Sequence, residues 1–304
     1  MPENSLSAQQ IKLITTKPAA AHKYDHGHCV IWGGRVMTGA AALAAMAALR
    51  IGAGLVSIIA HPENVYIYKS ISPSLLVEPM LEAARFRDHF ADPRRNVVVI
   101  GPGAGTENGA ALKKAVFDAV SLEAQKFCVL DADALTIFAD DPPLLYRAIH
   151  QGWGAQKQGG SNSSTEGSPI GPPISPRCVL TPHEGEFKKL FPTIDPSLSK
   201  MERAVEAAKL SGAIVVLKGA RSVIAAPDGR AVVNNTGTGW LATAGSGDVL
   251  GGIIAGLLAR DILPMFEGVC AAVFLHGRLA ELHGPGLISE DLPNLIPALL
   301  EDLN

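Results

Sequence analysis

The stretch "GSGDVLGG", residues 245–252, places one carboxylate, Asp248, between a turn of small residues and an apolar run. Gly245 and Gly247 carry no Cβ, so a phosphate can approach the backbone N–H groups closely. The apolar run is long enough for a helix, whose free N–H groups at its start favour negative charge. With Ser246, these residues predict an anion hole for a phosphate in transfer. Asp248 is suited to accept the proton of an attacking hydroxyl.

A structural interpretation of the same stretch is also open, in which Asp248 is simply the N-cap of a helix after a glycine-rich turn. That interpretation does not account for the density of glycines over residues 237–252. The segment "GTGWLA" (237–242) fits a dinucleotide-binding pattern, but no strand ending in an acid follows about twenty residues later. No lysine has the neighbours that a Walker loop requires. The sequence therefore predicts neither a Rossmann dehydrogenase nor a Walker nucleotide site.

Polar residues also follow several other apolar runs, at the points where strands are expected to end. In an open parallel sheet, ligands bind outside the carboxyl ends of the strands, where loops and helix starts converge. We therefore expect functional residues at these positions. The candidates are residues 101–105 in "GPGAG", Asp131 and Asp133 in "DADAL", His183, Glu184 and Glu186 in "PHEGE", and residues 218–222 in "KGARS".

Each of these candidates has a simpler structural interpretation. Asp131 and Asp133 are most simply turn or N-cap residues of the next helix. Glu186 is equally well explained as a first-turn carboxylate that faces the helix dipole. A lone His183 at a strand end is more often structural than a ligand. Lys218 is harder to explain in this way, because lysine is rarely buried without a partner.

Apolar runs of strand length alternate with helical patterns along most of the chain. Such continuous apolar runs are typical of strands buried on both faces of a parallel sheet. The helical patterns between them supply a layer for each face. The sequence therefore predicts a three-layer α/β fold, with a mostly parallel central sheet and helices on both faces. The predicted strands lie within 28–34, 55–60, 96–105, 127–135, 178–187 and 213–226, and the clearest helices within 38–54, 109–122, 201–212 and 249–260.

The chain is expected to form one domain over residues 22–304, preceded by an N-terminal extension, residues 1–21. Residues 151–177 are rich in Gly, Ser and Pro and nearly lack aliphatic side chains, which favours a flexible surface insertion. Because this insertion precedes the run that ends in "TPHEGE", we expect it to enter close to the substrate side.

Composition excludes several classes of protein. The 304 residues are 47% hydrophobic and 18% charged, with a net charge of −3 and no cluster of Lys and Arg, so nucleic acid is not an expected partner. The longest uncharged apolar stretch stops at Arg50, short of the ~20 residues of a membrane span. We expect a cytoplasmic protein whose cysteines are reduced core residues, because their spacing matches neither a zinc site nor a disulfide framework. They are Cys29, Cys128, Cys178 and Cys270.

An ordered set of motifs over roughly residues 22–300 resembles the ADP/ATP-dependent NAD(P)H-hydrate dehydratase family. The motifs are "HKYDHGHCVIWGG", "TGAAALAAMAALRIGAGLVSI", "VVVIGPGAG", "VLDADAL", "LTPHEGEF", "VVLKGARSVI", "NNTGTGWLATAGSGDVLGGIIAGLLA" and "AAVFLHGRLAE". The resemblance implies a ribokinase-like fold and a lyase that repairs hydrated NADH and NADPH. It also implies ADP or ATP as phosphate donor, with ADP favoured, together with Mg²⁺.

The resemblance also implies roles for individual residues. Those implied to contact the hydrated dinucleotide are Ala40, Gly103, His183 and Asp248, and those implied to hold the adenine nucleotide are Lys218, Gly219, Ala220, Arg221, Ser222 and Gly247. A homo-oligomer and a separate NAD(P)H-hydrate epimerase as partner are further expectations. Two alternatives stay open: a ribokinase-like kinase of a small hydroxylated vitamin precursor, and a nucleotide-binding sensor without turnover.

Overall fold

The computed structural model describes residues 3–121, 126–154 and 177–304. The described strands are β1 (His28–Trp32), β2 (Leu55–Ala60), β3 (Leu76–Pro79), β4 (Val97–Ile100), β5 (Phe127–Leu130), β6 (Cys178–Leu180), β7 (Ile214–Leu217), β8 (Val223–Ala225) and β9 (Ala231–Val233). The α-helices are α1 (Ala8–Thr15), α2 (Thr38–Arg50), α3 (Val65–Lys69), α4 (Gly109–Val120), α5 (Asp133–Thr136), α6 (Pro142–Gly154), α7 (Glu184–Leu190), α8 (Lys200–Ser211), α9 (Ser246–Arg260), α10 (Met265–His283) and α11 (Asp291–Asp302). Short 3-10 helices are η1 (Lys23–His26), η2 (Pro62–Asn64), η3 (Ala83–Phe90) and η5 (Gly239–Leu241).

All the described strands join one sheet, in the order β3-β2-β1-β4-β5-β6-β7-β8-β9. Every neighbouring pair from β3 to β7 is parallel, and only β8 and β9 are added antiparallel. This confirms the predicted mostly parallel α/β sheet. The order of the strands reverses between β1 and β4, and such a reversal point is where doubly wound sheets bind ligands, at the carboxyl ends of their strands.

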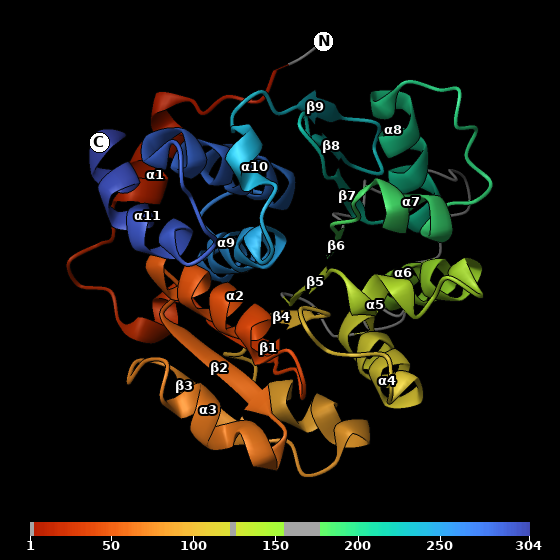
Figure 1. The fold of residues 1–304 in the computed structure, drawn as a ribbon, viewed down its shortest axis with the longest axis horizontal. Coiled ribbons are helices and arrows are strands. Elements are labelled where there is room, and N and C mark those ends of the chain that lie inside the picture. The colour runs from red at the N-terminus through yellow and green to blue at the C-terminus, as the bar shows by residue number, and fades with distance from the viewer. Residues whose placement is uncertain (1–2, 122–125, 155–176) are drawn as a thin grey trace, which may run out of the picture.

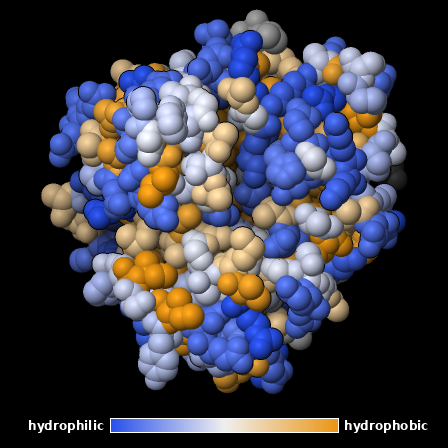
Figure 2. All heavy atoms as spheres, in the orientation of Figure 1, coloured by the Kyte–Doolittle hydropathy of each residue, from blue (hydrophilic) through white to orange (hydrophobic). Residues whose placement is uncertain are grey.

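Two hydrophobic cores lie on opposite faces of the sheet, because successive strand residues point in opposite directions. On β4, Val97 and Val99 belong to one core and Val98 and Ile100 to the other. Helices α2, α9, α10 and α11 cover the first core, and η3, α4, α6 and α8 cover the second. Figure 1 shows these two helical layers, with α2, α9 and α11 to the left of the sheet and α4 to α8 to its right. In the space-filling view, hydrophilic residues gather over α7 and α8, and hydrophobic residues gather over α2 and β2 (Figure 2).

Residues of the predicted N-terminal extension pack against the rest of the molecule. Ile14 is buried in the first core, and Glu3 forms an isolated β-bridge with Val233. The buried Arg260 guanidinium donates hydrogen bonds to the carbonyl oxygens of Ile14 (2.7 Å) and Thr16 (2.9 Å) at the end of α1. The described part of this segment is therefore attached to the domain, and the division of the chain at residue 21 stays a prediction.

Most of the predicted insertion, residues 155–176, lies outside the described residues. Its last residue, Arg177, directly precedes β6 and so lies at the amino-terminal end of that strand. The strand ends expected to bind ligands are at the opposite edge of the sheet. Because the rest of the insertion lies outside the described residues, the expectation that it enters close to the substrate side stays a prediction.

All four cysteines are buried and none forms a disulfide. Across the part of the chain that the structure describes, no helix has both the length and the apolar character needed to cross a membrane.

Candidate active site

The glycine turn predicted from the sequence precedes helix α9. Gly245 is the N-cap residue and has φ +90°, a conformation that favours glycine. A Cβ on Gly247 would lie 3.4 Å from the Lys218 ammonium and 3.7 Å from Oδ2 of Asp131. The bare backbone at the start of α9 thus faces a positively charged side chain. A helix start and an ammonium together form a site that favours a phosphate.

Asp248 lies in the first turn of α9 and is partly buried. Burial, followed by the charges of the Asp131 and Asp133 carboxylates, raises the pKa of Asp248, and the Lys218 ammonium opposes them, so that the resulting pKa is about 6. A carboxylate with such a pKa is still ionised at neutral pH but holds a proton more tightly than an ordinary aspartate. This is the property expected of a general base.

Lys218 and Asp131 form an ion pair at the carboxyl ends of β7 and β5. Nζ of Lys218 donates to Oδ1 of Asp131 at 2.7 Å, and the Asp131 carboxylate is almost fully buried. Asp133, two residues later, accepts a hydrogen bond from the backbone N–H of Gly105 at 2.9 Å. Neither aspartate caps α5, whose N-cap residue is Ala132. The N-cap half of the structural interpretation of Asp131 and Asp133 is therefore wrong. The turn half holds, because Asp131 directly follows β5 and accepts a hydrogen bond from the Ala132 N–H, and Asp133 lies in the first turn of α5.

His183 is the N-cap of α7. Its Nδ1 accepts hydrogen bonds from the backbone N–H groups of Gly185 (2.9 Å) and Glu186 (3.2 Å). Oε2 of Glu186 accepts in return from the His183 N–H (2.8 Å), which completes a capping box. The structural interpretations of His183 and Glu186 therefore hold. Because Nδ1 is an acceptor, the neutral ring carries its proton on Nε2, and the side chain is 61% exposed.

Ala40 and Gly103 meet where the strand order reverses. Gly103 has φ +62°, and a Cβ on it would lie 3.1 Å from Cβ of Ala40 and 2.3 Å from the Met37 carbonyl oxygen. The loop after β4 therefore rests directly on the start of α2. This contact lies at the switch point between β1 and β4, where a doubly wound sheet is expected to hold a ligand.

Residues 218–222 form the turn of the β7–β8 hairpin. Gly219, Ala220 and Arg221 are exposed, and Ser222 donates through Oγ to the Gly219 carbonyl at 3.2 Å. Nε of Arg221 donates to Oδ1 of Asn235 at 3.0 Å, which ties the hairpin to the loop after β9. Of the five residues predicted to hold the nucleotide through this motif, Lys218 is the one that reaches the glycine turn.

The sequence interpretation missed His276, a buried residue of α10. Its Nε2 donates to the Ser246 carbonyl at 3.0 Å and lies 3.2 Å from the Ser246 hydroxyl. Ser246 is itself buried, so its side chain faces α10. The available signal was one histidine inside the apolar run "AAVFLHG", a pattern that is also typical of an ordinary core position.

His276 makes the stability of the protein depend on pH. Burial lowers the pKa of His276 from 6.5 to about 4. The unfolded chain then takes up a proton near pH 6.5 while the folded protein does not, so stability is complete above pH 6.5 and is lost as the pH falls towards 4. We expect a loss of up to about 3 kcal/mol from this residue.

The measurement is urea unfolding between pH 4.5 and 7.5 of the wild type and of His276→Gln, which retains a donor but does not titrate. His28, whose pKa burial also lowers to about 4, contributes equally to both proteins. The wild type should lose more stability than the variant over this range. Parallel curves would rule out the contribution of His276.

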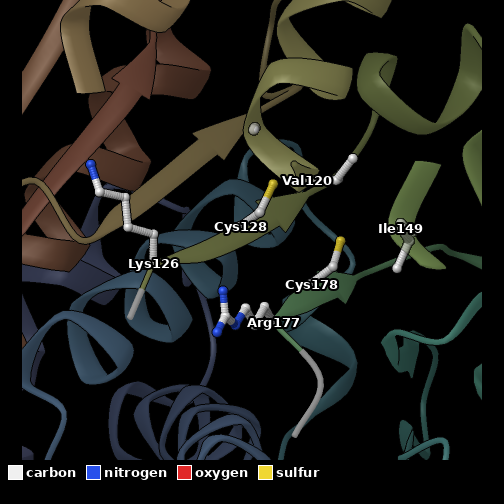
Figure 3. A pocket seen from close by; sticks show the side chains of 7 residues that line it. Val120, Lys126, Cys128, Ile149, Arg177 and Cys178 are labelled. Carbon is white, nitrogen blue, oxygen red and sulfur yellow. The ribbon is translucent and has the colours of Figure 1, made fainter. Parts of the chain in front are cut away.

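A small pocket lies away from these residues, at the amino-terminal ends of β5 and β6 (Figure 3). Its lining includes Cys128, Cys178, Lys126 and Arg177, whereas the predicted site residues lie at the carboxyl ends of the strands. The pocket is therefore separate from the candidate active site. Among the described residues, no three His, Cys, Asp or Glu side chains are grouped so that they could hold a metal ion.

The doubly wound sheet brings a glycine turn, a paired lysine and a carboxylate of raised pKa to its strand ends, and this combination is suited to the class of proteins that bind a phosphate group. A family model described as NAD(P)H-hydrate dehydratase matches residues 28–150 and 171–293. The chain is also 33% identical over 267 residues to the ADP-dependent (S)-NAD(P)H-hydrate dehydratase of Neisseria meningitidis, covering 86% of this chain and 79% of that one. This chain belongs to the NAD(P)H-hydrate dehydratase family.

Solved structures agree with this assignment. The ADP/ATP-dependent NAD(P)H-hydrate dehydratase of Bacillus subtilis, co-crystallised with ATP/Mg²⁺, matches 98% of each chain at 27% identity and a TM-score of 0.75. A ribokinase-like superfamily protein of Enterococcus faecalis matches with a TM-score of 0.77 at 24% identity, over 98% of this chain and 95% of that one, which supports the ribokinase-like fold. The bifunctional NAD(P)H-hydrate repair enzyme of Moorella thermoacetica is 33% identical over 310 residues, or 95% of this chain. The chain spans 52% of that enzyme's length.

Proposed function

We propose that this chain dehydrates the S form of NADH or NADPH hydrate, with a nucleotide as phosphate donor, and thereby restores the reduced dinucleotide. The observation that carries the proposal is Asp248 at the start of α9, beside Gly247 and the Lys218 ammonium. Membership of the dehydratase family supports the choice of substrate.

The proposed reaction has two steps, because hydroxide is a poor leaving group. Asp248 removes the proton of the ring hydroxyl, whose oxygen attacks the terminal phosphorus of the nucleotide. The bond between that phosphorus and the bridging oxygen breaks, so ADP leaves as AMP, or ATP as ADP. The backbone N–H groups of residues 245–247 and the Lys218 ammonium stabilise the charge on the transferring phosphate. The lone pair of the ring nitrogen then expels phosphate, and loss of a ring proton restores the double bond.

The positions of the remaining predicted residues support roles in binding the hydrated dinucleotide and the adenine nucleotide. Ala40 and Gly103, at the switch point, are proposed to contact the hydrated dinucleotide. The exposed ring of His183 offers a donor, Nε2–H, to the same substrate. The β7–β8 hairpin, residues 218–222, is proposed to hold the adenine nucleotide together with Gly247.

Magnesium is proposed to enter with the nucleotide. This ion prefers oxygen ligands and is commonly bound by substrate phosphates with one or two protein carboxylates, so the site does not need a dedicated cage of side chains. The carboxylates at the strand ends suit that donor set. When bound, the ion neutralises charge on the nucleotide phosphates.

ADP is the proposed donor, because the Neisseria meningitidis relative is named ADP-dependent. Relatives named bifunctional NAD(P)H-hydrate repair enzymes are about twice as long as the segment they share with this chain, which supports an NAD(P)H-hydrate epimerase as a functional partner. A homo-oligomer is proposed from the family resemblance. A cytoplasmic location is proposed because the cysteines are reduced.

The activity is tested by mixing the purified protein with NADH hydrate, Mg²⁺ and either ADP or ATP, and following the absorbance of reduced nicotinamide. We expect recovery that depends on the nucleotide and is faster with ADP. The control omits the nucleotide. If neither nucleotide restores absorbance while the protein still binds it, the proposed activity is wrong.

The pH dependence of kcat/KM should report the raised pKa of Asp248. The base acts only when it is ionised, so activity is constant above the pKa and falls as the pH drops through about 6. The rate is measured from pH 5 to 8, and samples returned from pH 5 to pH 7.5 must regain full activity. An activity that is unchanged down to pH 5 would argue against Asp248 as the base.

A further inference from the structure

Asp131 joins two parts of the candidate active site that are far apart in the chain. Its Oδ1 accepts hydrogen bonds from Nζ of Lys218 (2.7 Å) and from the backbone N–H of Ala132 (2.8 Å). The Asp131 side chain is 2% exposed and the Lys218 side chain 20%. Both charged groups lie close to the backbone of Gly247. The carboxylate therefore fixes the ammonium directly beside the glycine turn.

The backbone around Asp131 is held in a costly conformation. Ala132 has φ +47° and ψ −117°, a combination normally adopted by glycine, and such a residue costs about 1–3 kcal/mol. Gly101, at φ +124°, allows the close approach of the Asp131 carbonyl, since a Cβ on Gly101 would lie 1.7 Å from that oxygen. Strain of this kind persists where the surrounding structure demands one exact orientation, and here it orients Asp131.

The carboxylates around Lys218 keep its side chain positively charged. Burial alone lowers the pKa of Lys218, but the Asp131, Glu186 and Asp248 carboxylates outweigh it and raise the pKa above its ordinary value. The side chain is therefore an ammonium throughout the neutral range. A fixed positive charge beside a helix start is most useful where negative charge develops, on the phosphate in transfer.

We propose that Asp131 is a positioning residue for phosphoryl transfer, which acts by holding the Lys218 ammonium against the phosphate bound at the glycine turn. This inference rests on the proposed function of the site and extends it. If Lys218 acts on the transferring phosphate, its loss lowers kcat. If Lys218 only held the adenine nucleotide, its loss would instead weaken the affinity of the protein for the nucleotide.

The first test compares the wild type with Asp131→Asn, after circular dichroism has confirmed the fold of the variant. We expect kcat to fall on the order of 10²-fold. The Kd for ADP, measured by calorimetry, should change by less than about threefold, because the hairpin and the helix start remain. The acid limb of the pH profile should also move to lower pH, because the Asp131 charge raises the pKa of Asp248. A purely structural role would reduce the amount of folded protein without moving that limb.

The second test is a double-mutant cycle with Lys218→Gln. If Asp131 acts through Lys218, the double variant is no slower than Lys218→Gln alone, whereas additive losses overturn the proposal. If Asp131→Asn does not fold, the Lys218→Gln variant alone tests the proposal. A fall in kcat of Lys218→Gln supports the proposal, and a rise in its KM for the nucleotide without a change in kcat contradicts it. Because wild-type turnover is measured first, an inactive wild type contradicts the proposed function, and normal turnover by Asp131→Asn contradicts only this inference.

Discussion

Asp248→Asn should lower kcat by about 10³-fold or more, the range expected for the loss of a general base. Asparagine has nearly the same shape but cannot accept the proton of the ring hydroxyl. Nucleotide affinity should change by less than about threefold, because Gly247 and Lys218 remain in place. The measurement is steady-state turnover of NADH hydrate together with calorimetric binding of ADP.

The same helix offers a matched control for this substitution. Asp261 is the C-cap of α9, at the end opposite to Asp248, and has φ +49°. Asparagine tolerates this left-handed conformation well, so Asp261→Asn should leave turnover close to that of the wild type. Substantial turnover by Asp248→Asn, or an equal loss in both variants, would remove Asp248 from the role of base.

Gly252→Ala should reduce the free energy of unfolding by about 3 kcal/mol, the upper range for overpacking a close contact. Helices α2 and α9 pack closely against each other, and a Cβ on Gly252 would lie 2.1 Å from the carbonyl oxygen of Ala44. A backbone atom cannot rotate away as a side chain does, so the two helices must separate. Since α2 carries Ala40 and α9 carries Asp248, turnover should fall together with stability.

Gly251 provides the control, because it is adjacent in the same helix and a Cβ there would meet no described atom within 4 Å beyond the backbone of its own helix and its chain neighbours. Gly251→Ala should be neutral or stabilising by up to about 1 kcal/mol, from the higher helix propensity of alanine. Urea unfolding of both variants makes the comparison. Equal stability of the two variants would show that the contact between α2 and α9 does not restrict position 252.

Local patterns in the sequence were sufficient to predict the layers of the fold and the position of the glycine turn. Continuous apolar runs identified most of the parallel strands, and the glycines before an apolar helix placed Asp248 at the start of α9. These features depend on neighbouring residues and on periodicity, so one sequence is enough to recognise them. The grouping of the candidate site residues at one edge of the sheet could also be predicted, because parallel strands end at a common edge.

The contacts between distant segments could not be predicted in this way. Asp131 and Lys218 are 87 residues apart, and only the order of the strands brings their side chains together. His276 contacts the start of α9 because α10 packs on it, which no local pattern records. Trp32 of β1 is likewise buried against Phe86 of η3, a distant segment of the chain, with 4.9 Å between the ring centroids.

The most direct test of the proposed function is the balance between inorganic phosphate and reduced dinucleotide. The protein is mixed with NADH hydrate, Mg²⁺ and ADP, and phosphate, AMP and NADH are measured in the same sample over time. Transfer to the ring hydroxyl followed by elimination predicts one phosphate and one AMP for each NADH restored. A phosphorylated product that accumulates without release of phosphate would contradict the dehydratase and identify a kinase, and bound nucleotide without any turnover would identify a sensor.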